Sequence, residues 1–133
     1  MRVARVEAVG DAPARLIKLD VLSPDRPLAG HWTIGPERVV LEQAGGSIAY
    51  RFHARDAHLV LSPGTRQPIP FRVLLDGEGP GSSHGEDVDE DGNGLLRDGR
   101  LYQLVRQHDT VQERTLEITF LGPGAEAYSF TFV

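Results

Sequence analysis

Hydrophobic and polar residues alternate over several short segments of the chain, and this alternation is its strongest structural signal. In residues 47–53, for example, Ile48, Tyr50 and Phe52 share one face, and the residues between them form the other. A repeat of two residues is typical of antiparallel strands with one buried face. Clusters of glycine, proline and aspartate separate the segments, as turns between strands would. The pattern predicts strands over residues 3–9, 16–22, 37–43, 47–53, 58–61, 69–75, 100–106, 114–121 and 127–133.

The same pattern predicts the fold class. Helical signals are almost absent, and the one candidate segment, residues 11–19, contains Pro13. Many short amphipathic strands without helices are typical of two packed sheets. We therefore predict an all-β protein, an antiparallel β-sandwich with a jelly-roll-like topology, although alternation alone does not separate this topology from other sandwiches. A length of 133 residues fits a single domain spanning residues 1–133. The expected core includes Tyr50, Phe52, Phe71, Ile118, Phe120, Phe130 and Phe132.

One strand pairing follows from the alternation. Residues 47–61 fit a hairpin that turns at residues 54–57 and pairs His53 with His58, because this register sends the apolar residues of both strands to one face. Two imidazoles in such a pair could share a transition metal, with Asp56 in the turn between them. A tight metal site needs three or four ligands, and no further ligand is identified, so surface histidines are the favoured interpretation.

Composition and charge exclude several classes of function. The chain has no cysteine, which excludes disulfide bonds, thiolate metal sites and thiol redox chemistry within it. Its formal net charge of −5, from 14 Lys and Arg against 19 Asp and Glu, argues against nucleic-acid binding. No stretch approaches the roughly 20 apolar residues that span a bilayer, and residues 1–20 lack the apolar block of a signal peptide. We therefore expect no membrane insertion.

The acidic, glycine-rich segment of residues 76–98 contains a candidate calcium site. Alternate carboxylates followed by Gly92 fit the D-x-D-x-D-G opening of a calcium loop, with an acid at the twelfth position. The closing acid is Asp98, where such loops carry the longer Glu, and strands rather than helices are expected on both sides. The alternative, which we favour, is a solvated loop whose Asp, Asn and Gly residues form turns, with no cofactor. The candidate ligands are Asp87, Asp89, Asp91, Asn93 and Asp98.

From Gly30 onward, six stretches of the chain match one known family. They are Trp32-Thr-Ile-Gly-Pro-Glu, Glu42-Gln-Ala-Gly-Gly-Ser-Ile-Ala-Tyr-Arg-Phe-His-Ala-Arg-Asp, Phe71-Arg-Val-Leu-Leu-Asp-Gly, His84-Gly-Glu-Asp-Val-Asp, Arg100-Leu-Tyr-Gln-Leu-Val-Arg and Glu117-Ile-Thr-Phe-Leu-Gly-Pro-Gly-Ala-Glu-Ala-Tyr-Ser-Phe-Thr-Phe. These stretches follow the family's order and cover most of the chain. With them, the chain resembles the C-terminal domain of thioredoxin-like proteins of the DipZ type.

The resemblance implies a β-sandwich shaped like a carbohydrate-binding module, preceded in the family by a thioredoxin-like redox domain. In DipZ itself, both domains follow a membrane-embedded electron-transfer domain and face outward, so a domain appended in this way would lie outside the cytoplasm. This chain resembles the sandwich alone and lacks the paired cysteines, so the family's redox activity does not carry over. Residues 1–27 match poorly, and two interpretations are open: they form additional edge strands of the sandwich, or they lie at the boundary of the domain.

These observations predict a non-catalytic accessory module of a thioredoxin-like redox protein, which positions the redox domain or binds a partner or substrate protein. One alternative is a free-standing carbohydrate-binding module with a glycan ligand. Such modules present Trp or Tyr rings to solvent, and Trp32 and Tyr102 are the two aromatic residues outside the predicted core faces. They are the candidate ligand-binding residues, with packing at the rim of the sandwich as the other interpretation.

The second alternative is an enzyme with an unrecognised site. Ser82 and His84 lie in a glycine-rich loop that lacks the strand–turn–helix setting of a nucleophile elbow. We therefore predict that the chain is not an enzyme. The ligand, the cellular compartment and the oligomeric state do not follow from the sequence.

Overall fold

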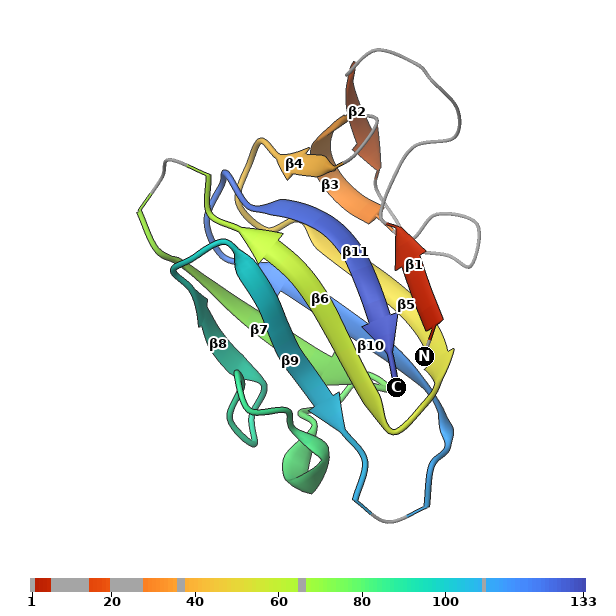
Figure 1. Ribbon diagram of the computed structural model, residues 1–133. Helices are drawn as coiled ribbons and strands as arrows, with labels where there is room; N and C mark the ends of the chain where they lie inside the picture. The colour runs from red at the N-terminus through yellow and green to blue at the C-terminus, as the bar shows by residue number, and fades with distance from the viewer. Residues whose placement is uncertain (1, 6–14, 20–27, 36–37, 65–66, 109) are drawn as a thin grey trace.

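The computed structural model describes residues 2–5, 15–19, 28–35, 38–64, 67–108 and 110–133, and these residues are built almost entirely of strands (Figure 1). Every described strand pair is antiparallel. None of the described residues forms a helix that is long and apolar enough to cross a membrane. The elements are β1 (Arg2–Arg5), β2 (Arg15–Leu19), β3 (Leu28–Ile34), β4 (Val39–Leu41), β5 (Ser47–His53), β6 (Asp56–Ser62), β7 (Ile69–Leu75), the 3₁₀ turn η1 (Gly81–Ser83), β8 (Asn93–Leu96), β9 (Arg100–Arg106), β10 (Glu113–Phe120) and β11 (Glu126–Phe132).

The strands form two layers that are joined at β3. The strand order is β8-β7-β10-β5-β3-β4-β11-β6-β9, with β1 added beside β11 and β2 beside β3. Leu28 and Ala29 pair with β5 in one layer, whereas residues 32–34 pair with β4 in the other. In Figure 1, β11, β6 and β9 lie in front of β5, β10 and β7. The predicted fold, an antiparallel β-sandwich of jelly-roll-like form, is confirmed.

The core lies between the two layers and is made by the apolar faces that the alternation predicts. Phe52, Phe71, Ile118, Phe120, Phe130 and Phe132 are each at most 4% exposed. Tyr50 is the exception, because its ring is only half-buried while it stacks on Phe130 and Phe132, both with centroids 5.2 Å away. Aromatic rings in such offset or tilted contacts add to the stabilisation that burial alone provides.

The predicted hairpin between β5 and β6 is wrong. β5 pairs with β10, and β6 pairs with β9 and β11, so the two consecutive strands lie in different layers. His53 accordingly faces Glu113, and His58 faces Gln103 and Thr131. Alternation predicted which residues point inward, but inward residues can meet across the sandwich as well as across a hairpin. The histidines are therefore not cross-strand neighbours.

Two strands were missed by the sequence pattern, β3 and β8. β3 contains Gly30, whose positive φ of 111° suits glycine, and β8 begins with an Asn-Gly pair that reads as a turn. Residues 76–98 are therefore not irregular throughout, because η1 and β8 lie within them. Residues 1–27 contribute β1 and β2, as added strands on β11 and β3, while the parts of the predicted strands at residues 6–9 and 20–22 lie outside the described residues.

Candidate functional site

Trp32, the first candidate ligand-binding residue, lies in β3 inside the sandwich. Its side chain has no exposed area, its indole Nε1–H donates to the Ala29 carbonyl over 2.8 Å, and its ring meets Phe120 edge-on with centroids 6.2 Å apart. A buried indole whose N–H is already satisfied offers no face to a sugar ring. The structure therefore places Trp32 in the core, in agreement with the packing interpretation and not with an exposed platform.

Tyr102, the second candidate, is buried in β9 and holds the turn that joins β8 to β9. Its hydroxyl donates to the Asp98 carbonyl (2.7 Å) and accepts from the backbone N–H groups of Arg97 (3.3 Å) and Asp98 (3.1 Å). The Arg100 guanidinium lies over the ring, 3.9 Å from its centroid. The ring is 1% exposed, so Tyr102 also fails as a platform residue in this structure. It anchors the loop instead.

The remaining aromatic residues give the same result. All of them lie within the described residues, and none is exposed. Tyr50 and Tyr128 are half-buried, and the others are fully buried. The Tyr128 hydroxyl donates to Glu126, and its pKa is raised by burial and by the nearby Glu126 charge. The outer faces of the described strands therefore carry no exposed aromatic ring on which a sugar could stack.

The predicted calcium ligand Asp89 instead builds a turn. Its Oδ1 atom accepts the backbone N–H groups of Asp91 (3.0 Å) and Asn93 (2.9 Å), and its own N–H donates to the Asn93 carbonyl (3.1 Å). These hydrogen bonds, that from the Asn93 backbone first, hold the pKa of Asp89 below its usual value. Such side-chain to backbone bonding is the reason that aspartate is favoured in turns.

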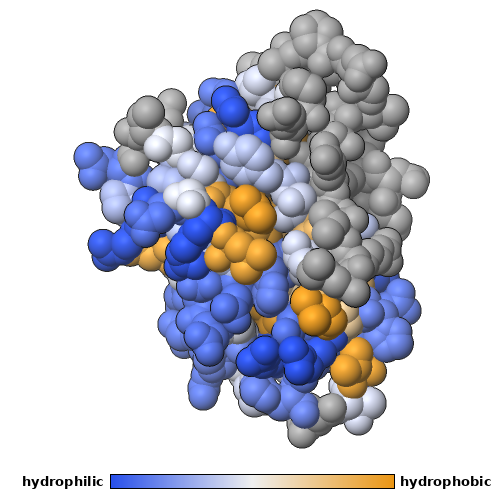
Figure 2. Space-filling view, viewed as in Figure 1, coloured by the Kyte–Doolittle hydropathy of each residue, from blue (hydrophilic) through white to orange (hydrophobic). Residues whose placement is uncertain are grey.

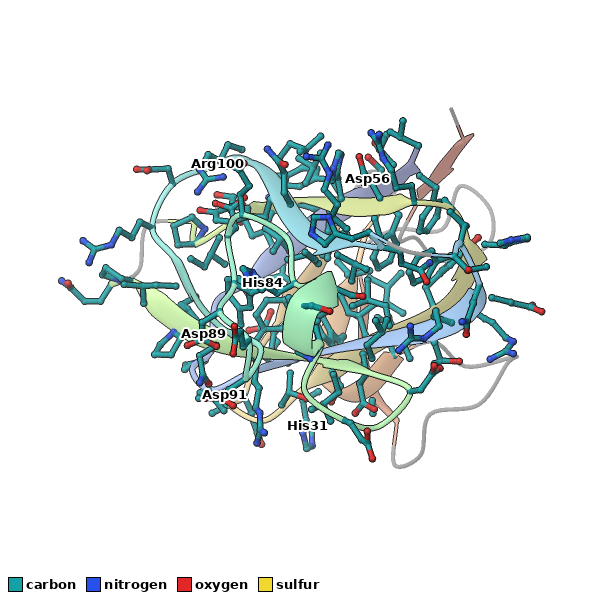
Figure 3. The ribbon with its side chains drawn as sticks, turned by 90° about the horizontal axis from the view of Figure 1, so that it is seen from below. His31, Asp56, His84, Asp89, Asp91 and Arg100 are labelled. Atoms are coloured by element: carbon teal, nitrogen blue, oxygen red, sulfur yellow. The ribbon has the colours of Figure 1, made fainter. Side chains whose placement is uncertain are left out.

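The predicted ligand Asp87 is bound to β9 by two hydrogen bonds. Asp87 accepts from Arg100 Nη2 (2.8 Å) through Oδ1 and from the Gln103 N–H (2.7 Å) through Oδ2. Burial raises the pKa of Asp87, but these two hydrogen bonds outweigh burial, so the pKa lies below its usual value. Figure 3 shows Asp89 and Asp91 together on the loop, well away from Asp56. Over the described ranges, no three His, Asp or Glu side chains converge in a way that could hold a metal ion. Calcium binding by the loop stays a prediction.

Residues 84–88, here called the strap, close the outer edge of β9. The Gly85 N–H donates to the Leu104 carbonyl (3.0 Å) and the Asp87 N–H to the Gln103 carbonyl (3.1 Å). The strap approaches so closely that a Cβ atom on Gly85 would lie 2.2 Å from the Gln103 oxygen. An open strand edge invites pairing with another chain, and the strap covers this one.

Sequence analysis missed a cluster of charged residues at the end of the sandwich, formed by Arg55, Asp56 and Arg106 and here called the Asp56 cluster. Asp56 begins β6, and its side chain is 3% exposed, whereas those of Arg55 and Arg106 are 53% and 43% exposed. Burial acts against ionisation of Asp56, but the hydrogen bonds from Arg106 and Arg55 outweigh it and lower its pKa. Arg106 is 50 residues away, so only the pairing of β6 with β9 brings it to Asp56, and no sequence spacing announces the contact.

Gln107 and His58 surround this cluster. Gln107 is buried, and its Nε2 donates to the carbonyls of Ala54 (2.9 Å) and Gln112 (3.1 Å), which fixes the turn that carries Arg55. His58 is half-buried, and burial lowers its pKa, while the charge of Asp56 acts in the opposite direction. The cluster thus combines a buried anion with two half-exposed cations, and His58 lies beside it. Charge-assisted hydrogen bonds of this kind are among the strong ones in proteins.

Comparison with known proteins gives one family and a fold likeness. The family model described as "Thioredoxin like C-terminal domain" matches residues 20–132. A family two carbohydrate esterase from Cellvibrio japonicus shares 9% identity, with a TM-score of 0.53 over 98% of this chain and 33% of the esterase chain, so the present chain spans about a third of that protein. The module CsCBM6-3 from Clostridium stercorarium, solved with cellobiose, shares 11% identity, with a TM-score of 0.45 over 98% of this chain and 92% of the module. No curated protein sequence matches the chain.

Proposed function

The chain belongs to the family of thioredoxin-like C-terminal domains, and we propose that it is the non-catalytic accessory module of a thioredoxin-like redox protein. The observation that carries this proposal is the family match, which extends over residues 20–132 and includes β3 to β11. The absence of cysteine in the chain leaves thiol chemistry to the redox domain. In this arrangement the sandwich supplies contacts and the redox domain supplies the reaction.

The ligand in this proposal is a protein, either the redox domain or its substrate. Glycan recognition by a β-sandwich would call for exposed aromatic rings, and both candidate rings, Trp32 and Tyr102, are buried. The exposed side chains on the described strands are instead a mixture of polar, charged and aliphatic groups, including Arg51, His53 and Leu101. A mixed polar and apolar surface of this kind suits a non-obligate protein interface, which is about as polar as the rest of a protein surface.

Two parallel binding measurements test the proposal. In the first, a thioredoxin-like domain taken from a two-domain member of the family is titrated into the ¹⁵N-labelled chain, and saturable chemical-shift changes are expected. In the second, the fluorescently labelled chain is applied to a glycan array, where no reproducible binding is expected. Glycan binding together with no response to the redox domain would overturn the proposal in favour of a carbohydrate-binding module.

An activity measurement tests the non-catalytic part separately. The purified chain alone should not accelerate insulin reduction by dithiothreitol, because it has no thiol to cycle. The same assay with the redox domain present provides the positive control. Reduction by the chain alone that persists after a second purification step would contradict the assignment.

A further inference from the structure

We infer that the outer face of β7 and β10 is a contact surface for a second copy of the chain, with which it forms a weak twofold dimer. The inference is independent of the proposed function, because it concerns contacts between two copies and not the binding of a redox domain. It rests on an exposed row of apolar side chains, on two charged side chains beside that row, and on their placement by a twofold axis.

The apolar row consists of Leu95 on β8, Pro70 on β7 and Leu121 directly after β10. Leu95 and Pro70 are cross-strand partners, and the Leu121 N–H donates to the Pro70 carbonyl over 2.9 Å. All three are exposed while a neighbour of each along the chain is buried, and Leu121 at 58% is the most exposed large hydrophobic side chain of the described residues. Cross-strand partners stand side by side on one face of a sheet, so the row is a continuous apolar strip across this layer.

The outer face of the other layer carries a less exposed apolar pair. Leu101 of β9 is 38% exposed, and its cross-strand partner Val60 of β6 is half-buried. Figure 2 shows this face, on which hydrophobic side chains lie among hydrophilic ones, whereas β7 and β10 lie behind it in Figure 1. Contiguous exposed apolar surface is a common mark of a protein interface. The row on β8, β7 and β10 is therefore the stronger candidate.

Two side chains of opposite charge lie beside the row on the same face. Arg72 and Thr119 form the next outward-facing pair of β7 and β10, and Glu117 follows two residues away on β10. Glu117 is half-buried and forms no hydrogen bond or ion pair with another described residue. Arg72 donates from Nε to the Asp91 carbonyl (3.4 Å) but forms no ion pair within the described part of the chain. One cation and one anion without an ionic partner suit a surface that carries the same two charges, namely a second copy.

A twofold axis that runs along the strands, midway between β7 and β10, makes these groups complementary. It places β7 of one copy over β10 of the other, so that Pro70 lies over Leu121 of the second copy. Arg72 then lies over Thr119 of the second copy and about 7 Å along the strand from its Glu117, which an arginine side chain can reach. Every contact forms twice, as in any isologous interface.

The edge of the row fits the same arrangement. The Gly45 N–H donates to the Phe120 carbonyl (2.8 Å), so Gly45 lies beside the end of β10. Gly45 is exposed, and a Cβ atom on it would have no neighbour within 4 Å. The axis places Leu95 over Gly45 of the second copy, where no side chain occupies the space. Because the row is short, the dimer belongs to the weak, transient class of interfaces.

Sedimentation velocity of the full chain over a wide range of concentrations tests the inference. The sedimentation coefficient should rise with concentration towards that of a dimer. Leu121→Asp should leave a monomer at every concentration, because it buries a carboxylate against Pro70 of the second copy. Leu101→Asp is the matched control, an exposed leucine on the outer face of the other layer, and it should dimerise like the wild type.

Charge reversal tests the pairing of Arg72 with Glu117. Arg72→Glu and Glu117→Arg should each weaken dimerisation roughly tenfold or more, because each brings like charges together twice. The double variant restores both ion pairs and should dimerise almost as tightly as the wild type, which loss of folding in the single variants would not allow.

Three results would overturn the inference: a wild type that stays monomeric, a dimer that Leu101→Asp disrupts and Leu121→Asp does not, or a double variant as weak as the single ones. If the wild type is monomeric and Leu121→Asp instead weakens binding of the redox domain, the apolar row belongs to that partner. The proposed function would then stand while the dimer is wrong.

Discussion

Among single residues, Tyr102 shows how one buried hydroxyl organises a surface turn. The Tyr102→Phe substitution removes a donor to the Asp98 carbonyl and an acceptor for two backbone N–H groups. We expect the free energy of unfolding in urea to fall by about 1–3 kcal/mol, because the three hydrogen bonds of a buried hydroxyl are lost together. Tyr128→Phe, at a half-buried hydroxyl with Glu126 as its partner, should cost less. Equal losses in the two variants would contradict this role for Tyr102.

Substitutions of Asp89 distinguish its role in the turn from its predicted role as a calcium ligand. Asp89→Ala removes the Oδ1 acceptor of two backbone N–H groups and should lower the melting temperature even in EDTA, whereas Asp89→Asn keeps an acceptor and should stay close to the wild type. Differential scanning fluorimetry with EDTA and with millimolar calcium provides the measurement. A calcium-dependent rise in melting temperature that both variants lose would instead establish the metal site.

The candidate residues differ in how well the sequence alone could predict their roles. The turn-forming role of the acidic loop could be predicted, because it depends on neighbours within a few residues of Asp89. The burial of Trp32 could not be predicted, because Gly30 interrupts the alternating pattern of the strand in which Trp32 lies. The Asp56 cluster could not be predicted either, since Arg106 reaches Asp56 only through the pairing of β6 with β9. Contacts between distant residues leave no mark in local spacing.

Among the elements, the strap on β9 depends on a glycine for its close approach. In Gly85→Ala, the added methyl group would meet the Gln103 carbonyl, so the strap must move outward and lose its hydrogen bonds to β9. We expect a loss of about 1–3 kcal/mol. Hydrogen exchange should be faster at the Gln103 amide, because this N–H donates to the carboxylate of Asp87 in the strap. Gly122→Ala is the matched control, because its Cβ would lie 3.6 Å from the nearest atom, an Ile69 methyl group. Unchanged exchange at Gln103 in the Gly85→Ala variant would argue against a strap.

Alternation predicted the faces of most strands correctly and the partner of β5 incorrectly. The residues of β6 that it placed inward, Leu59 and Leu61, are fully buried. The predicted layer of β6 was wrong because a repeat of two residues specifies only whether a side chain points inward or outward. A short connection at residues 54–55 can lead either to a hairpin or across the sandwich. Which of the two occurs depends on the competing partners β9, β10 and β11, which follow later in the chain.

For the whole molecule, His58 makes stability depend on pH. Burial lowers its pKa from 6.5, so the unfolded chain takes up this proton at a higher pH than the folded chain. The stabilising contribution is therefore complete above about pH 6.5 and declines as the pH falls below it. We expect urea midpoints to decrease between pH 7 and pH 5, and His58→Gln should reduce this decrease. An identical pH profile in the variant would contradict the assignment.

The fold class and the function were predictable on different grounds. The sandwich follows from residue patterning, because repeated amphipathic strands without helices have few other ways to bury their apolar faces. The accessory role came from resemblance to a family, since no local constellation of residues specifies it. Burial of Trp32 and Tyr102 removes the two rings that sequence reasoning offered for sugar stacking, and that observation needed three dimensions.

The position of β11 has a consequence for how the protein is made. This strand follows all the others in the chain, yet it lies inside its layer, paired with β4, β6 and β1. While the ribosome is still adding residues 126–132, β4 and β6 have already emerged without the strand that separates them, and their edges and apolar faces stay open. The layer can close only when residues 126–132 leave the exit tunnel. Until then, the open edges of β4 and β6 are free to pair with other chains.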